Sequence, residues 1–266
     1  MRLNIALAQM DVAFGEREKN KASLQRLAEK LPDQCDYLVL PELWNIGYDL
    51  EHLDEKAETL KGDSVRFLKY LAKKHQVNII GGSIAERRDD GFYNTMPVIS
   101  KEGELIDKYR KVHLFSHAIH ESSYFKAGDE WGLTRVGDLT FGLMLCYDLR
   151  FPAFCRNLVL RDASVIFVPA QWPAARNDHY TSLLKARAIE NQVYVIGVNR
   201  CGKDNLAYGG SSMIISPDGT VLTACGEEEG LSCCEIYVES DHYIRKMIPV
   251  FQDRRNILDE IDNNLL

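Results

Sequence analysis

The sequence predicts an α/β protein, with strands in the interior and helices on the outside. Two observations support this prediction. Short apolar runs of strand length alternate with segments of helical periodicity along the 266 residues. Turn signals separate these segments, and alternating strands and helices favour helices packed against sheets. No linker rich in Pro, Gly and Ser divides the chain, so we predict a single domain over residues 1–266.

Each element of the first half is predicted from its local pattern. A helix over residues 16–30 would place Leu24, Leu27 and Leu31 on one face, and Asp63 can cap a helix that ends at residue 75. Apolar runs and turn residues predict strands at 4–10, 36–40 and 77–84, a charged turn at 86–91, and a hairpin of 93–100 with 105–109.

The second half repeats this alternation. The predicted elements are strands at 139–145, 164–168, 194–199 and 231–238, helices at 152–161 and 178–191, and a hairpin of 213–215 with 221–224. A polar helical tail is predicted after the last strand. Both halves run strand, helix, strand, helix, strand and hairpin. This order suggests a divergent duplication, although no repeat at the level of residues supports one.

Composition and charge exclude several classes of protein. The 32 Lys and Arg against 39 Asp and Glu give a net charge of −7, which provides no basic surface for nucleic acid or an anionic membrane. No apolar run reaches the length of a membrane span. Asn4, Gln9 and Asp11 interrupt the first apolar stretch, so no secretion signal is predicted, and no prenylation motif ends the chain. Seven cysteines cannot all pair, and we expect free thiols in the cytoplasm.

Three reactive side chains follow predicted strands. Glu42 comes after a short apolar run, Lys111 after the strand over 105–109, and Cys146 after the strand over 139–145. Ligand crevices of α/β proteins form at the carboxyl ends of strands. A helix that begins near Cys146 and a cation such as Lys111 would both favour the thiolate. Cys146 is therefore a candidate nucleophile.

Each of these residues also has an ordinary structural interpretation. A cysteine after an apolar strand is more often part of the core, and a glutamate after a proline is usually in a solvated turn. A lysine in a basic edge strand can serve to prevent aggregation. Taken together, however, the three side chains provide a base, a cation and a nucleophile. We therefore interpret them as a set.

Three histidines raise the alternative of a metal-dependent hydrolase. His113 and His117 are four residues apart, and His120 precedes Glu121. Two histidines at this spacing can share one face of a helix, but the preceding pattern is strand-like and no H-E-x-x-H motif accompanies them. The sequence therefore predicts loop histidines and no metal. Without a phosphate loop or a G-x-G-x-x-G motif, no nucleotide cofactor is predicted either.

A second group of residues, beyond another predicted strand, could bind a substrate. Trp172 and Arg176 lie where the chain leaves that strand and could line the same crevice. Arg176 would form a bidentate pair with a substrate carboxylate, unless it is only a surface residue after a Trp-Pro turn. Arg150 is the other candidate to bind the substrate carboxylate. Its ordinary structural interpretation is an internal ion pair with Asp148 or Glu190.

Three motifs, in this order, resemble the catalytic signatures of the nitrilase superfamily of carbon–nitrogen hydrolases. They are Leu40-Pro41-Glu42, Tyr109-Arg110-Lys111-Val112-His113-Leu114 and Leu145-Cys146-Tyr147-Asp148-Leu149-Arg150-Phe151-Pro152. Arg187-Ala188-Ile189-Glu190-Asn191 and Tyr93-Asn94-Thr95 extend the resemblance over nearly the whole chain. It implies a four-layer α-β-β-α sandwich that usually dimerises through its outer helices. A homodimer or higher homo-oligomer is therefore expected.

The resemblance also implies a Glu–Lys–Cys triad, carried by Glu42, Lys111 and Cys146, and a second glutamate, which matches Glu121. By this analogy Glu42 takes the thiol proton and later activates water, while Cys146 attacks an amide carbonyl to form a thioester. Lys111 and the backbone N–H of Tyr147 hold the oxyanion. Glu121 orients Lys111 or the amide nitrogen of the substrate.

The residues after Cys146 resemble the amidase branch that includes omega-amidases, which act on 2-oxo acid amides such as 2-oxoglutaramate. True nitrilases usually carry Trp-Glu after the cysteine, and carbamoylases Asn-Asp-Arg-Arg. We therefore expect a cysteine-dependent amidase that hydrolyses a small, linear, carboxylate-bearing amide with water to the acid and ammonia. The alternatives are a deaminated glutathione amidase, an N-carbamoyl amidohydrolase and a non-catalytic binding module.

Overall fold

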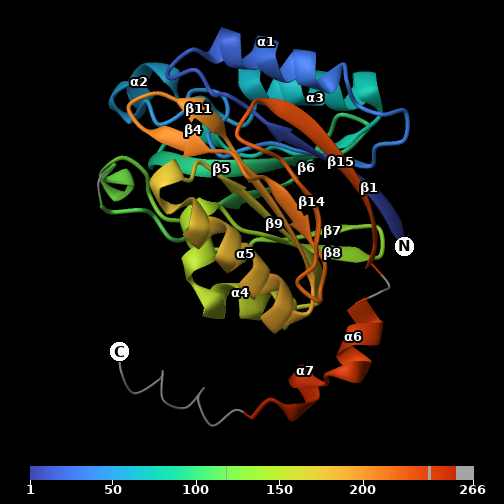
Figure 1. The fold of residues 1–266 in the computed structure, drawn as a ribbon. Coiled ribbons are helices and arrows are strands. Elements are labelled where there is room, and N and C mark those ends of the chain that lie inside the picture. The colour runs from blue at the N-terminus through green and yellow to red at the C-terminus, as the bar shows by residue number, and fades with distance from the viewer. Residues whose placement is uncertain (118, 239–240, 256–266) are drawn as a thin grey trace.

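Two β-sheets lie face to face between two pairs of helices (Figure 1). The structure, a computed structural model, describes residues 1–117, 119–238 and 241–255. The first sheet has the strand order β15-β1-β2-β3-β5-β4, with β6 paired to β5. The second sheet has the order β14-β13-β10-β9-β8-β7, and β11 and β12 form a separate two-stranded ribbon.

The first sheet consists of β1 (Arg2–Gln9), β2 (Tyr37–Val39), β3 (Asn78–Ile80), β4 (Ile84–Arg88), β5 (Gly91–Ile99), β6 (Leu105–Arg110) and β15 (Gly230–Tyr237). The second consists of β7 (Leu133–Val136), β8 (Leu139–Leu143), β9 (Ala163–Ala170), β10 (Tyr194–Asn199), β13 (Met213–Ile215) and β14 (Val221–Ala224). The ribbon pairs β11 (Cys201–Lys203) with β12 (Ala207–Gly209). The α-helices are α1 (Arg17–Ala28), α2 (Leu53–Lys56), α3 (Asp63–His75), α4 (Pro152–Val159), α5 (Asn177–Asn191), α6 (Asp241–Met247) and α7 (Val250–Asp253).

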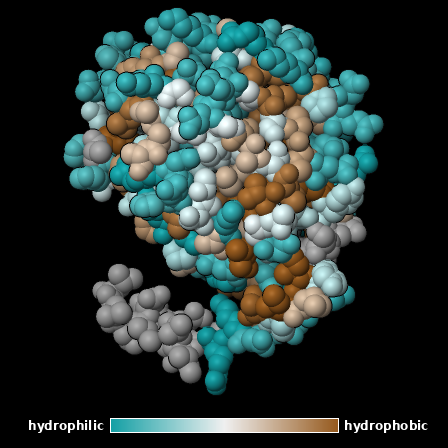
Figure 2. All heavy atoms as spheres, viewed as in Figure 1, coloured by the Kyte–Doolittle hydropathy of each residue, from teal (hydrophilic) through white to brown (hydrophobic). Residues whose placement is uncertain are grey.

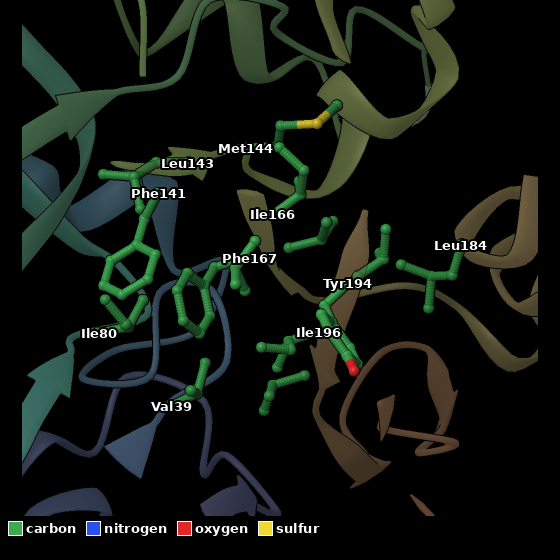
Figure 3. Close-up of a cluster of buried hydrophobic side chains, with 14 of the residues drawn as sticks. Val39, Ile80, Phe141, Leu143, Met144, Ile166, Phe167, Leu184, Tyr194 and Ile196 are labelled. Carbon is green, nitrogen blue, oxygen red and sulfur yellow. The ribbon is translucent and has the colours of Figure 1, made fainter. Parts of the chain in front are cut away.

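The strands are apolar on both faces, because each sheet is covered on both sides. In β1, Ile5 packs in the core between the sheets, whereas the neighbouring Ala6 packs in the cluster that α1 and α3 cover. Phe141 of β8 and Phe167 of β9 meet edge to face, with their ring centroids 5.3 Å apart, and Figure 3 shows them facing Ile80 and Val39 of the first sheet. Helices α4 and α5 cover the outer face of the second sheet (Figure 1). The predicted four-layer α-β-β-α sandwich is confirmed.

The two sheets repeat one topology. In the first, β1, β2 and β3 are parallel neighbours and β5 follows antiparallel; in the second, β8, β9 and β10 are parallel and β13 follows antiparallel. Helices α1 and α3 connect the first three parallel strands, and α4 and α5 connect the second three. This is the order that the sequence predicts for its two halves. A divergent duplication stays a prediction.

The predicted strand over 77–84 is wrong in one respect, because the chain breaks into β3 and β4 around Gly82. This glycine has a φ of +56°, and a Cβ at this position would lie 1.9 Å from the carbonyl oxygen of Pro41. The break brings Ser83 Oγ within 2.8 Å of the backbone N–H of Leu43, which donates to it. The segment that carries Glu42 is therefore held against this break. The predicted charged turn at 86–91 is also shorter, since β4 extends to Arg88.

We expect the substitution Gly82→Ala to lower the free energy of unfolding by about 2–5 kcal/mol. The loss has two causes, because alanine disfavours the left-handed backbone and its Cβ would clash with the carbonyl oxygen of Pro41. Gly137→Ala is the matched control, because Gly137 has a φ of +60° and a Cβ added there would meet no atom of the described residues within 4 Å. It should lose only the backbone contribution of about 1–2 kcal/mol. Urea unfolding measures both. Equal losses would show that the contact with Pro41 does not matter.

The remaining differences are local. The sequence pattern does not predict β7, β11 or β12, which are only three or four residues long. Asp63 is the first residue of α3 and not its cap, and its carboxylate lies 2.6 Å from Lys21 Nζ. The predicted helical tail is confirmed in α6 and α7, and its continuation over 256–266 lies outside the described residues. Among the helices described, none is long and apolar enough to cross a bilayer.

Candidate active site

The candidate catalytic residues meet where strands of both sheets end. Glu42 follows β2, Lys111 follows β6 directly, and Cys146 follows β8. The backbone N–H of Gln171, the residue after β9, donates to Glu42 Oε2 at 3.0 Å and so connects the two sheets. A pocket of about 200 Å³ opens at this point. Its lining includes Cys146, Tyr147, Phe115, Arg150, Trp172 and Arg176.

Lys111 lies between two carboxylates, and all three side chains are fully buried. Its Nζ donates to Glu42 Oε1 at 2.7 Å and to Glu121 Oε1 and Oε2 at 2.9 and 2.7 Å. Buried charges are stable only when they are paired and hydrogen-bonded. The structure therefore brings together three of the residues predicted from the sequence, including Glu121, which lies in a short 3₁₀-helix (Glu121–Ser123).

The electrostatics of the cluster keep the lysine charged. Burial alone would lower the pKa of Lys111, but the Glu121 and Glu42 carboxylates raise it above its ordinary value. Burial raises the pKa of Glu121, with a smaller contribution from Glu42 in the same direction, while Lys111 lowers it. The cluster holds one cation and two carboxyl groups, so a proton is held more readily here than in water.

Cys146 occupies a strained turn between β8 and a 3₁₀-helix (Cys146–Arg150). Its φ is +42°, a left-handed conformation that a residue with a Cβ rarely adopts. Asp148, which is fully buried, holds this turn: its Oδ2 accepts hydrogen bonds from Leu145 N at 2.8 Å and from Tyr109 Oη at 2.7 Å. Because Tyr109 is two residues from Lys111, Asp148 ties the turn of Cys146 to the strand that precedes the lysine.

The sequence-based expectation of a thiolate is wrong for the resting protein. Burial raises the pKa of the Cys146 thiol well above its ordinary value, and the Glu42 carboxylate raises it further. Lys111 and the backbone N–H of Gln171 lower it, but these effects are smaller. Lys111 is shared between two carboxylates, and its effect on the sulfur is too small to offset the burial of the thiol. The raised pKa therefore makes Cys146 a thiol rather than a thiolate near pH 7.

Two residues to which the sequence assigned no role hold the Glu42 side chain in place. Gln171 donates through its backbone to Glu42 Oε2, and its side-chain Nε2 donates to the carbonyl oxygen of Glu42 at 2.7 Å. Asn94 Nδ2 donates to Glu42 Oε1 at 2.9 Å. The available signals were the position of Gln171 directly after a strand and that of Asn94 at the start of a hairpin. Neither signal indicates that these side chains would bind Glu42.

Both candidate arginines lie at the pocket, with their guanidinium groups over aromatic rings. Arg150 lies 4.6 Å from the centroid of Trp172, and Arg176 lies 5.7 Å from the centroid of Phe115. The alternative of an internal ion pair for Arg150 is wrong, because Asp148 is bound by other groups and Glu190 pairs with Arg187. The pocket therefore has two cations available to an anionic ligand.

The three histidines do not form a metal site. His113 Nδ1 lies 2.7 Å from Asp148 Oδ1, and its ring stacks on Phe151 with centroids 3.6 Å apart. His117 lines the pocket, whereas His120 precedes the 3₁₀-helix of Glu121. Within residues 1–117, 119–238 and 241–255, no three His, Cys, Asp or Glu side chains gather so that they could hold a metal ion. The histidine cluster therefore gives no support to a metal-dependent hydrolase.

Comparison with known proteins identifies the class that this fold and site define. Residues 4–242 match the family model described as Carbon-nitrogen hydrolase. The chain therefore belongs to the carbon-nitrogen hydrolase family, and the resemblance drawn from its three motifs is confirmed.

Individual relatives are similar over almost the whole chain. The chain is 42% identical to the 2-oxoglutaramate amidase of Bacillus subtilis (strain 168) over 260 residues, which cover 97% of this chain and 100% of that protein. It is 30% identical to the omega-amidase NIT2 of Homo sapiens over 263 residues, 96% of this chain and 95% of the relative. A CN-hydrolase superfamily protein from Xanthomonas campestris, whose crystal structure has an arsenic adduct in the active site, superposes with a TM-score of 0.90 at 32% identity, over 96% of this chain and 98% of that one.

Proposed function

We propose that this chain is a cysteine-dependent amidase of the omega-amidase type, which hydrolyses a 2-oxo acid amide such as 2-oxoglutaramate to the acid and ammonia. The observation that carries the proposal is the buried cluster of Glu42, Lys111 and Glu121, which lies next to Cys146. Cys146 itself lines a pocket that is also lined by two arginines. The 42% identity to a 2-oxoglutaramate amidase supports the substrate class.

In the first half of the proposed reaction, Glu42 takes the proton of the Cys146 thiol as the sulfur attacks the amide carbon. A tetrahedral intermediate forms, and its oxygen carries the negative charge. The carbon–nitrogen bond then breaks, the nitrogen takes the proton from Glu42, and ammonia leaves. A thioester on Cys146 remains. The raised pKa of the thiol supports this order, because the sulfur is protonated until a base acts on it.

In the second half, Glu42 removes a proton from water, and the resulting hydroxide attacks the thioester carbon. The carbon–sulfur bond breaks, the thiol regains its proton from Glu42, and the carboxylic acid leaves. Lys111 stays charged throughout, so it can stabilise the oxyanion together with the backbone N–H of Tyr147. Glu121, which accepts two hydrogen bonds from Lys111 Nζ, orients that ammonium.

The pocket supports a substrate with a carboxylate at the end away from the reacting amide. Trp172 Nε1 donates to the carbonyl oxygen of Arg176 at 2.8 Å, which fixes the segment that carries this arginine. Arg150 lies over the ring of the same Trp172. A volume of about 200 Å³ suits a small molecule rather than a polymer. Arg176 is our first candidate for the carboxylate, and Arg150 is the second.

We expect replacement by Ala of the arginine that binds the substrate carboxylate to lower kcat/KM for 2-oxoglutaramate. The loss should correspond to about 2–5 kcal/mol of transition-state stabilisation, because the buried carboxylate of the substrate loses its cation. An uncharged amide of similar length should lose far less. The measurement is ammonia release from both substrates with Arg176→Ala and Arg150→Ala.

Arg161→Ala is the matched control, because Arg161 lies 4.2 Å from the centroid of Trp131 and does not line the pocket. It should leave both substrates unaffected. Equal losses on the charged and the uncharged amide would mean that the arginine is structural.

The proposed function itself is tested with a panel of amides with and without a free carboxylate, together with an N-carbamoyl compound, read as ammonia release. We expect the carboxylate-bearing 2-oxo acid amide to be hydrolysed best, and a chelator to have no effect. Wild-type protein without a preference for carboxylates would exclude the omega-amidase type but leave a cysteine amidase. A protein that hydrolyses no amide would be the non-catalytic binding module.

We also propose that the chain forms one domain, works in the cytoplasm and assembles with copies of itself. Exposed apolar side chains gather on α6, α7 and the end of α5 (Figure 2), and such patches commonly mark interaction sites. They are Ile189, Tyr243, Met247, Ile248 and Val250. Light scattering after chromatography should give at least twice the mass of 30.3 kDa, and a monomer would contradict the proposal.

A further inference from the structure

Asn94, in β5, contacts each of the three charged residues of the proposed catalytic cluster. Its side-chain Nδ2 lies 2.9 Å from Glu42 Oε1 and 2.9 Å from Glu121 Oε1. Its backbone carbonyl oxygen accepts a hydrogen bond from the backbone N–H of Lys111, also at 2.9 Å. The residue is fully buried and does not line the pocket, so it can act on the reaction only through these neighbours.

The three partners of Asn94 come from separate parts of the chain. Glu42 follows β2, Lys111 ends the hairpin of β5 and β6, and Glu121 lies in a 3₁₀-helix beyond a long loop. An amide NH₂ group has two N–H bonds, and here each points to a different carboxylate. Asn94 thus fixes the separation of the two carboxylates, and because it is neutral it adds no charge to a buried cluster.

The orientation of this amide is determined by its surroundings. Turning it over would place Oδ1 against two carboxylate oxygens, which are also acceptors. In the observed orientation Asn94 Oδ1 is buried without a hydrogen-bond partner among the described residues. A buried acceptor without a partner is unfavourable. The unpaired Asn94 Oδ1 is therefore an unfavourable feature that accompanies the hydrogen bonds of both N–H groups to the carboxylates.

The electrostatics explain why a bridge is needed. Two carboxylates beside one ammonium repel each other, and burial together with Glu42 raises the pKa of Glu121. The hydrogen bond from Asn94 to Glu121 favours the ionised form of that carboxylate and opposes its uptake of a proton. Among the described residues, the ionisable groups that interact with Glu42 or Glu121 include Lys111, Cys146 and the phenols of Tyr48, Tyr180 and Tyr208. Burial raises the pKa of these phenols, so they are neutral near pH 7.

We propose that Asn94 is a positioning residue that holds the Glu42 carboxylate at a fixed distance from Glu121, so that Glu42 can take the proton of the Cys146 thiol. This inference rests on the proposed function, because it gives Glu42 the role of the base. Asn94 itself touches neither the substrate nor the sulfur. Its contribution should therefore appear in the chemical step and in its pH dependence, and not in substrate binding.

The test compares Asn94→Ala and Asn94→Asp with the wild type by measuring ammonia release over a range of pH. In Asn94→Ala we expect kcat to fall about 10²-fold, because a misplaced catalytic group costs about this much, while KM changes little. The acid limb of the kcat/KM profile should move up by about one to two pH units, because Glu121 loses a hydrogen-bond donor in a cluster where burial already raises its pKa. Asn94→Asp should lose more, since it adds a third carboxylate.

Asn191→Ala is the matched control, because Asn191 is also fully buried, has its Oδ1 unpaired within the described residues, and donates to groups of α4 and α5 rather than to the catalytic cluster. It should keep the acid limb of the wild type. Losses in Asn94→Ala that equal those of Asn191→Ala, or that appear in KM alone, would overturn the inference.

If Asn94→Ala does not fold, Asn94→Ser is used for the same comparison, and an unshifted acid limb contradicts the inference. If the wild type hydrolyses no amide, the proposed function fails as well; an active wild type with unshifted variants overturns only the role of Asn94.

Discussion

Replacing Cys146 by Ala is expected to abolish ammonia release, with kcat reduced about 10⁶-fold, the scale at which a nucleophile is lost from a catalytic unit. The physical reason is that without the sulfur no thioester can form, and a water molecule in its place lacks both the position and the nucleophilicity. Rapid quenching followed by intact-mass measurement should detect the acyl group on the wild-type chain and not on Cys146→Ala. Turnover close to that of the wild type would contradict the mechanism.

The control for this experiment is Cys155→Ala. Cys155 lies nine residues further on, in α4, where it is fully buried against the core and its Sγ accepts a hydrogen bond from Asn191 Nδ2 at 3.5 Å. Burial raises the pKa of this thiol to about 12. A buried thiol of this kind contributes packing only, so Cys155→Ala should retain the kcat of the wild type.

A double variant checks that Glu42 and Cys146 act as a unit. Glu42→Gln alone should lose about 10²–10⁴-fold in kcat, the usual contribution of a general base. Glu42→Gln combined with Cys146→Ala should be barely worse than Cys146→Ala alone, because the base has no function without its thiol. Additive losses would show that Glu42 acts elsewhere, for example only in folding.

Lys111→Met is expected to abolish activity and also to destabilise the fold by about 3–5 kcal/mol, the effect of removing one partner of a buried ion pair. Glu42 and Glu121, both fully buried, would lose the ammonium to which they bind at 2.7 Å. Urea unfolding gives the stability, and ammonia release gives the activity. A Lys111→Met variant as stable as the wild type would contradict the ion-pair network.

The loss of stability in Lys111→Met should depend on pH in a defined direction. Burial already raises the pKa of Glu121 above its ordinary value of 4.5, and removal of the cation would raise it further. At Glu121 the folded state then binds more protons than the unfolded chain, so the contribution of this residue to stability is fully present below pH 4.5 and is lost as the pH rises. The gap between variant and wild type should therefore be wider at about pH 8 than at about pH 5.

Lys111→Arg distinguishes charge from shape in the same position. The guanidinium keeps the positive charge, but it is planar and larger than an ammonium. Lys111 Nζ binds three carboxylate oxygens at 2.7–2.9 Å in a site without exposed surface, which leaves no room for the larger group. Lys111→Arg should therefore be inactive but more stable than Lys111→Met at about pH 8.

Sequence patterns predicted most of the elements because helices and buried strands have distinct periods. The strands β10, β13 and β14 match the predicted ranges, and the position of helices outside and strands inside follows from the alternation of the two kinds of segment along the chain. The patterns failed where the conformation depends on distant atoms. Gly82 breaks a strand because it passes against the carbonyl of Pro41, and nothing in the residues around Gly82 indicates that contact.

The sequence by itself determined the alternation of strands and helices and the order in which Glu42, Lys111 and Cys146 follow their strands, because these features depend on neighbours along the chain. Only the tertiary structure decided which side chains complete the cluster and whether the sulfur carries a charge. The hydrogen bond between Gln171 and Glu42 spans 129 positions, and that between Asn94 and Glu42 spans 52. The protonation of Cys146 depends on its burial and on carboxylates that reach it from other elements. Desolvation and charge act through space, so no local pattern in the sequence contains them.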